Sequence, residues 1–166
     1  MIDPNSPLLT IPVLDTALKG ATDPVVRVQI LAAKVQVLQR DSASARSNAT
    51  ASSSATGDDN ASAPSNAAQH DPTPLLAARL DLADGYLATN PTDHHSASAE
   101  ASVVEVDCKR IQKRVDRLKS ENAPLEPWMS QISALRKRAV TILADVDQGL
   151  GRNSRAERWR KIAQEL

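Results

Sequence analysis

The sequence has no phenylalanine, and its aromatic side chains are limited to Tyr86, Trp128 and Trp159. Aromatic rings usually supply much of the buried area of a globular core. A chain without them has to bury aliphatic side chains, which suits helices packed side by side. We therefore expect an all-α fold, an antiparallel helical hairpin or bundle with coiled-coil character, interrupted by disordered low-complexity loops.

Disulfides, membrane-spanning segments and a secretion signal are also lacking. The one cysteine, Cys108, cannot form a disulfide within the chain. No apolar run approaches the roughly 18 residues that a membrane helix needs, and no charged start leads into an apolar signal core. These absences predict an intracellular protein of the cytoplasm or nucleus, without a transmembrane segment.

Motifs that carry known chemistry are missing as well. The chain has no Gly-rich phosphate loop, no Gly-x-Ser-x-Gly elbow, no His-Glu-x-x-His and no Cys-x-x-Cys. Cys108 falls at a core position of a helical pattern, so we expect an inert buried thiol. His70 and the run Asp93-His94-His95 lie in low-complexity segments, where solvated loops are expected rather than metal sites. We therefore predict no enzyme, no cofactor and no bound metal.

Two low-complexity segments divide the chain. Residues 42–73 contain no Val, Ile, Leu, Met or aromatic residue and are mostly Ser, Ala, Asn, Asp and Thr. Such a segment buries too little apolar area to offset the entropy lost on ordering. We predict an N-terminal helical segment at 1–41, a disordered linker at 42–73 and a helical coiled-coil region at 74–166. A similar but shorter segment within that region predicts a flexible loop at 88–102.

Proline and glycine positions mark the ends of the expected helices. Asp23-Pro24 pairs an N-cap residue with the first helical position, and Gly149 and Gly151 end a later helix. Gly85 weakens its helix by roughly 1 kcal/mol relative to alanine. The expected helices span residues 10–19, 24–40, 73–89, 101–122 and 127–148, followed by a short helix to the C-terminus.

Large apolar residues recur at alternating steps of three and four, the heptad spacing of coiled coils. The prolines between 122 and 128 make a continuous helix unfavourable, and the matched helix lengths favour an antiparallel hairpin over a kinked rod. Stripes this thin need further apolar surface, from the N-terminal helices, a second copy or other subunits. The predicted partner-binding seam is Val28, Leu31, Val35, Leu38, Val104, Ile111, Val115, Leu118, Trp128, Ile132, Leu135, Ile142 and Val146.

Charge is unevenly distributed along the chain, although its formal net charge is zero. Residues 1–100 hold 6 basic and 11 acidic side chains, a net charge of −5, whereas residues 101–166 hold 14 and 9, a net charge of +5. A basic half can bind nucleic acid or another anionic surface, but the two halves can equally attract each other or stay solvated. Candidate anion-binding residues are Lys109, Arg110, Lys113, Arg117, Arg155, Arg158 and Lys161.

Together these patterns predict a non-catalytic helical subunit of a larger protein complex. Its expected partners are other helical proteins, with a hetero-oligomer favoured over a homodimer. The alternative function is binding of nucleic acid or an anionic surface by the basic C-terminal half.

Overall fold

The structure, a computed structural model, describes residues 9–52 and 71–166, apart from the side chains of residues 46–52. Helices make up most of these two ranges, and neither range contains a β-strand. The all-α class predicted from the sequence is therefore confirmed. The helical segments are α1 (Ile11–Gly20), α2 (Pro24–Ser52), α3 (Thr73–Leu87), α4 (His94–Ser120), the 3-10 helix η1 (Pro127–Gln131), α5 (Ile132–Gly149) and α6 (Asn153–Glu165).

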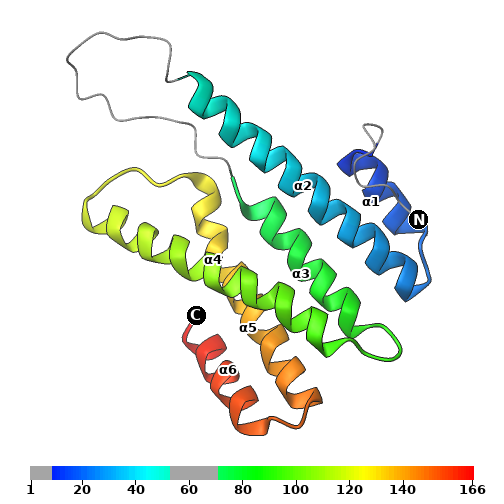
Figure 1. The fold of residues 1–166 in the computed structure, drawn as a ribbon. Coiled ribbons are helices and arrows are strands. Elements are labelled where there is room, and N and C mark those ends of the chain that lie inside the picture. The colour runs from blue at the N-terminus through cyan, green and yellow to red at the C-terminus, as the bar shows by residue number, and fades with distance from the viewer. Residues whose placement is uncertain (1–8, 53–70) are drawn as a thin grey trace, which may run out of the picture.

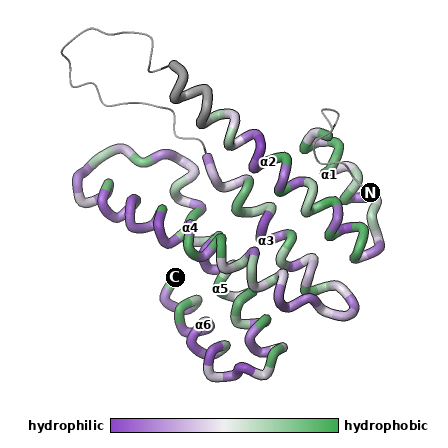
Figure 2. The backbone as a smooth tube through the Cα atoms, in the orientation of Figure 1, coloured by the Kyte–Doolittle hydropathy of each residue, from purple (hydrophilic) through white to green (hydrophobic). Residues whose placement is uncertain are grey.

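The helices follow one another across the molecule in chain order (Figure 1). Each helix packs mainly on the helices before and after it, and α3 also contacts α5. One outer edge is α1, which packs on α2, and the other is α6, which packs on α5. The largest apolar cluster lies between these edges, among α3, α4 and α5, while hydrophilic residues predominate along the second half of α4 and along α6 (Figure 2).

The helices α4 and α5 run antiparallel. A guanidinium nitrogen of Arg136 lies 3.3 Å from a carboxylate oxygen of Glu105. Further along, the ring of His94 lies against Gly149, where an added Cβ would clash with its Cε1. Residue numbers therefore rise along one helix as they fall along the other. This is the hairpin that the sequence favoured over a kinked rod.

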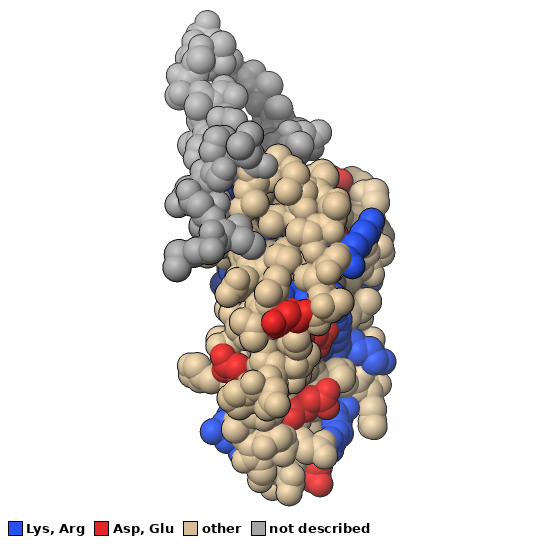
Figure 3. Space-filling view, turned by 90° about the vertical axis from the view of Figure 1, so that its right-hand side faces the viewer, with Lys and Arg blue, Asp and Glu red and all other residues tan. Residues whose placement is uncertain are grey.

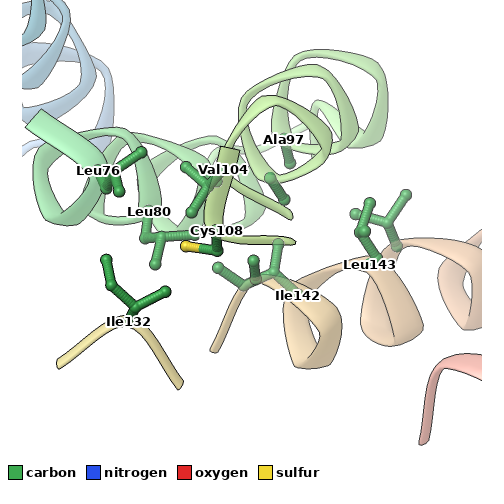
Figure 4. Packing of buried hydrophobic residues seen from close by; sticks show 12 residues of the cluster. Leu76, Leu80, Ala97, Val104, Cys108, Ile132, Ile142 and Leu143 are labelled. Atoms are coloured by element: carbon green, nitrogen blue, oxygen red, sulfur yellow. The ribbon is translucent and has the colours of Figure 1, made fainter. Parts of the chain in front are cut away.

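Small side chains line the inner side of α4. Ala97, Ala101, Val104 and Cys108 are all fully buried, at steps of four, three and four residues. The heptad pattern therefore extends two positions further towards the N-terminus than large apolar residues alone suggest. The sulfur of Cys108 points into the space beside Leu80 of α3 (Figure 4). Because alanine places only a methyl group in the contact, the helices can approach closely.

The flexible loop predicted at 88–102 is wrong over most of its length. Only residues 88–93 connect α3 to α4, because α4 begins at His94. The composition that predicted a loop consists largely of alanine and serine. Alanine has the highest intrinsic helix propensity, and here Ala97 and Ala101 also bury their methyl groups in the core. A shortage of large apolar residues was therefore misleading at this position.

The predicted linker at 42–73 also needs correction at both ends. α2 continues to Ser52, so residues 42–52 are helical. Within that extension the hydroxyl of Ser42 donates to the carbonyl oxygen of Leu38 at 2.7 Å, a bond back to the preceding turn that a helix tolerates. At the other end, a carboxylate oxygen of Asp71 accepts a hydrogen bond from the backbone N–H of Thr73 at 2.8 Å. The rest of the predicted linker, residues 53–70, lies outside the described residues.

Gly85 occupies the crossing point of α2 and α3. A Cβ added there would lie 3.2 Å from a methyl carbon of Val28 and 3.3 Å from one of Leu31. Both contacts are tighter than ordinary van der Waals packing, so the two helices meet across the missing side chain. The helix propensity lost at this glycine is therefore offset by close packing between α2 and α3.

The N-terminus of α4 is capped by Asp93. One carboxylate oxygen accepts a hydrogen bond from the backbone N–H of Ser96 at 3.0 Å, and the other accepts one from the Ser96 hydroxyl at 2.6 Å. These two hydrogen bonds lower the pKa of Asp93 below its usual value, because they favour the charged form. Asp93 therefore acts as the N-cap residue of α4.

The alanine packing can be tested with two substitutions on one helix. Ala101→Leu should reduce the free energy of unfolding by about 1–3 kcal/mol, because extra methylene groups do not fit a fully packed site. Ala99→Leu, at an exposed position of α4, should change it by less than about 0.5 kcal/mol. Denaturant unfolding of both variants provides the measurement. Equal effects would mean that residues 94–102 do not pack as described.

The cap predicts a stability difference that depends on pH. Asp93→Ala should cost about 1 kcal/mol at neutral pH, the usual value for losing an N-cap. Because the folded-state pKa is lowered, the carboxylate contributes its stability above the unfolded-state pKa of about 3.9 and loses it as pH falls through the folded-state value. The difference in melting temperature between the original chain and the Asp93→Ala variant should therefore be smaller near pH 3 than at pH 7. A melting-temperature difference that is the same at both pH values would contradict the role of the Asp93 carboxylate as the cap. Thr92→Ala, at the neighbouring residue, is the control.

Candidate interaction surface

The residues predicted to form a partner-binding seam lie in or beside the core of the chain itself. Those that are buried are Leu31, Val35, Val104, Val115, Ile132, Ile142 and Val146. Those that are partly buried are Val28, Leu38, Ile111, Leu118, Trp128 and Leu135. The extra surface that the sequence required is supplied by neighbouring helices of the same chain, since α3 packs on both α4 and α5 and α2 packs on α3. These apolar residues therefore pack against other helices of the same chain.

The candidate anion-binding residues of α4 are all exposed. Arg110 lies 3.9 Å from Asp107, and Arg117 lies 2.9 Å from Glu121, each pair within one turn of the helix. The hydrogen bond and charge of Glu121 raise the pKa of Arg117 above its usual value. Within the described residues no ion pair involves Lys109 or Lys113, so the ammonium groups of these two candidates are free.

The candidates of α6 divide into two groups. Arg158 and Lys161 are exposed and have no ion-pair partner in the part of the chain that the structure describes. Arg155 is different, because its Nε lies 3.0 Å from a carboxylate oxygen of Asp147 on α5. Its charge therefore holds α6 to α5 instead of facing solvent unpaired.

Asp147 is the most deeply buried charged residue of the described chain, with 3% of its surface exposed. The indole N–H of Trp159 donates to the same carboxylate at 3.0 Å, and an Arg152 guanidinium nitrogen lies 3.6 Å from its other oxygen. The backbone N–H of Arg152 also donates to the Asp147 carbonyl oxygen at 2.7 Å. Gly151, with φ of 71°, supplies the left-handed residue that this reversal between helices needs. Asp147 thus fixes the α5–α6 corner.

Two other arginines of the basic half form ion pairs between helices. Arg136 pairs with Glu105 of α4, and both side chains are largely buried. Arg138 reaches Asp81 at 2.8 Å and Asp84 at 2.5 Å, both on α3. These carboxylates raise the pKa of Arg138 although burial alone would lower it. Part of the charge asymmetry along the sequence is therefore satisfied inside the molecule. On the face viewed in Figure 3, basic and acidic side chains are interspersed within a large uncharged area.

A second heptad stripe runs along the side of α4 opposite its buried seam. Val103, Val106, Arg110, Lys113 and Arg117 follow one another at steps of three and four, and every one is exposed. We call these five residues the outer stripe. Val103 is 41% exposed and Val106 is 54% exposed. Because α4 packs on α3 and α5 through its other side, the outer stripe is not covered by those helices.

The one cysteine of the chain, Cys108, lies in the buried seam on the other side of α4 from the outer stripe. Burial raises the pKa of the Cys108 thiol to about 12, so it stays protonated and unreactive at neutral pH. The described residues contain no group of three or more His, Cys, Asp or Glu side chains placed to hold a metal ion. A hollow beside α1 is lined by Pro12, Val13, Thr16 and Ala17, which offer no charged group. His70 lies outside the described residues.

Sequence reasoning missed three features of this region. Ala97 and Ala101 were not counted as core residues, although the heptad spacing continues through both. In the sequence Asp147 is an ordinary polar residue near a helix end. Only the fold shows that its carboxylate is buried and bound by Trp159 and Arg155 of the next helix. The exposed pair Val103 and Val106 could have been found from the sequence, since they continue the spacing of Arg110, Lys113 and Arg117.

Comparisons with models of protein families, with curated proteins and with solved structures found no match to this chain.

The role of Asp147 can be tested by removing its carboxylate. Asp147→Ala should reduce the free energy of unfolding by about 1–3 kcal/mol, because the indole N–H of Trp159 and the guanidinium of Arg155 lose their shared acceptor. Asp145→Ala, at an exposed position of the same helix, should have an effect below about 0.5 kcal/mol. Denaturant unfolding measures both. Similar losses for the two variants would show that the α5–α6 corner does not depend on this carboxylate.

Proposed function

We propose that this chain is a non-catalytic helical subunit of a larger protein complex and that it binds a partner helix along the outer stripe of α4. The observation that carries the proposal is the difference between the two sides of α4. The inner heptad seam is buried against the chain's own helices, whereas the outer stripe has the same spacing and is exposed. A helix face with heptad-spaced apolar residues is the feature that partner helices recognise.

The size of the exposed surface indicates how such binding would work. Completing the burial of Val103 and Val106 is worth on the order of 2 kcal/mol in total, since each is already about half covered. Micromolar binding requires about 8 kcal/mol. The two valines alone therefore fall short, and the remaining free energy has to come from the basic half of the outer stripe. The aliphatic stems of Arg110 and Lys113 add apolar contact area there.

Only substitutions on the exposed side of α4 can report on partner binding without also affecting the stability of the fold. An aspartate at a residue of the predicted seam, such as Ile111, would not isolate partner binding. Ile111 packs against the main core of this chain, so an aspartate there would destabilise the fold itself. Substitutions at Val103 and Val106 separate partner binding from folding, because both side chains are on the outside.

An anionic surface or nucleic acid is the second candidate partner. Lys109, Lys113, Arg158 and Lys161 support it, because they are exposed and unpaired within the described residues. The support is weaker than for a helical partner, since Asp107 and Asp116 lie on the same helix as the first two and Glu121 caps its end. Nonspecific phosphate binding falls steeply as salt rises. Exposed ion pairs between proteins are also screened by salt, so nuclease treatment at low salt is what separates the two functions.

The proposed location is the cytoplasm or nucleus. No helix in the described ranges combines the length and apolar character needed to cross a membrane. The single cysteine is free and buried, which suits the reducing compartments of a cell.

Substitution of both outer valines tests the proposed function. We expect the tagged full chain, purified from its source cells at low salt and treated with nuclease, to retain one or more protein partners. Val103→Asp combined with Val106→Asp should lose them, because two carboxylates would have to be desolvated in the interface. The melting temperature of the purified variant should stay within a few degrees of the original.

The matched control is Val25→Asp, since Val25 on α2 is 54% exposed, as is Val106. This variant should keep the partners. The proposal fails if the original chain retains no protein after nuclease treatment at low salt, or if the double variant retains the same proteins as the control.

A further inference from the structure

The outer stripe changes character halfway along its length. Its first half is apolar, with Val103 and Val106, and its second half is basic, with Arg110, Lys113 and Arg117. At 1.5 Å per residue the stripe is roughly 21 Å long, about four turns of helix. A partner helix lying along it would therefore need about 15 residues with apolar contacts at one end and anionic contacts at the other.

The basic half is available for such contacts. Arg110 is held only by Asp107 at 3.9 Å and Arg117 only by Glu121 at 2.9 Å, and these side chains are substantially exposed. Exposed pairs of this kind contribute little to stability, so both arginines can exchange partners readily. Lys113, between them, has no ion pair among the described residues and is the central cation of the outer stripe.

A second copy of this chain does not fit the outer stripe. In a parallel arrangement the basic halves would face each other, which places like charges opposite one another. In an antiparallel arrangement Val103 would meet Arg117, Val106 would meet Lys113, and Arg110 would meet itself. Both arrangements leave cations without anions, so the outer stripe favours a different protein.

The charge pattern also favours one direction for the partner. Acidic side chains stabilise the first turns of a helix, where the helix dipole is positive. A partner whose carboxylates face Arg110, Lys113 and Arg117 therefore most favourably carries them in its own N-terminal half. That half lies beside the C-terminal half of α4, so the two helices run antiparallel.

We infer that the outer stripe binds the amphipathic helix of another protein, with acidic residues in its N-terminal half and apolar residues in its C-terminal half. This inference rests on the proposed function and specifies the chemistry of its partner. Carboxylates of the bound helix pair with Arg110, Lys113 and Arg117, and its apolar side chains cover Val103 and Val106.

Site-specific crosslinking tests the inference. A photoreactive amino acid replaces Val106 or Lys113 in the full chain, expressed in its source cells, and the crosslinked peptides are sequenced after irradiation. Both positions should crosslink to one segment of another protein. The Lys113 contact should be rich in Asp and Glu, and it should precede the apolar Val106 contact by about seven residues in the partner sequence.

The other outcomes are separable. Crosslinks to a neutral or basic protein segment, to a second copy of this chain or in the parallel order would overturn the inference and leave the proposed function standing. No protein crosslink above the level at Val25 would reject both. Crosslinks to nucleic acid instead would favour the second candidate function.

Charge reversal provides an independent readout. With the segment identified, Arg110→Glu combined with Lys113→Glu should weaken its binding to the full chain by about tenfold or more. Replacing the opposing carboxylates of the segment with lysines should restore it. Lys19→Glu combined with Lys137→Glu changes the net charge equally at exposed positions on α1 and α5, and it should leave binding unchanged. Equal loss in both double variants, or failure of the swap to restore binding, would contradict specific charge pairing.

Discussion

Close packing of α4 between α3 and α5 is the contact on which the other elements of this fold depend. It is possible because Ala97, Ala101 and Cys108 place small side chains where the helices meet. A dense interior gains dispersion energy from every short contact, and small residues let backbones come near enough to make many of them. The layers on either side are built on this unit: α2 on α3 across Gly85, and α6 on α5 around Asp147. This chain has no phenylalanine, and its interior is packed by close approach of the helices instead of by large aromatic side chains.

Much of this architecture could be predicted from the sequence, and the limits follow from particular residues. Prolines and capping residues located the starts of α2 and α3, and heptad spacing located the central part of α4. The spacing did not identify what the seam would face, because a stripe such as Val104 to Leu118 looks the same whether its partner is α5 or another protein. The first two turns of α4 were missed because alanine and serine occur both in unfolded segments and in tightly packed helices. Distances between helices decide which applies, and a sequence contains no such distances.

The charges of the C-terminal half show a similar division. Arg136, Arg138 and Arg155 belong to ion pairs that join helices, with carboxylates that lie up to 57 residues away in the chain. The remaining cations on α4 are free or paired only within a turn. Uneven charge along a sequence therefore does not by itself indicate an anionic partner. The informative charges are those that take no part in ion pairs between helices. On α4, cations of this kind continue the heptad spacing of the two exposed valines, Val103 and Val106.

The packing of helices in chain order has a consequence for how the molecule opens. In such an arrangement an end helix can separate without disturbing helices beyond its neighbour, as in proteins built from stacked repeats. α1 contacts α2 through a small cluster around Leu14 and Ile30, whereas α4 is enclosed on two sides. Amide hydrogens of α1 would then exchange with solvent through local openings of low free energy, while those of α4 exchange only when the whole unit unfolds. The backbone of α4 is thus held by packing on two sides, so a partner bound along it has to order the exposed side chains of the outer stripe but not the helix that carries them.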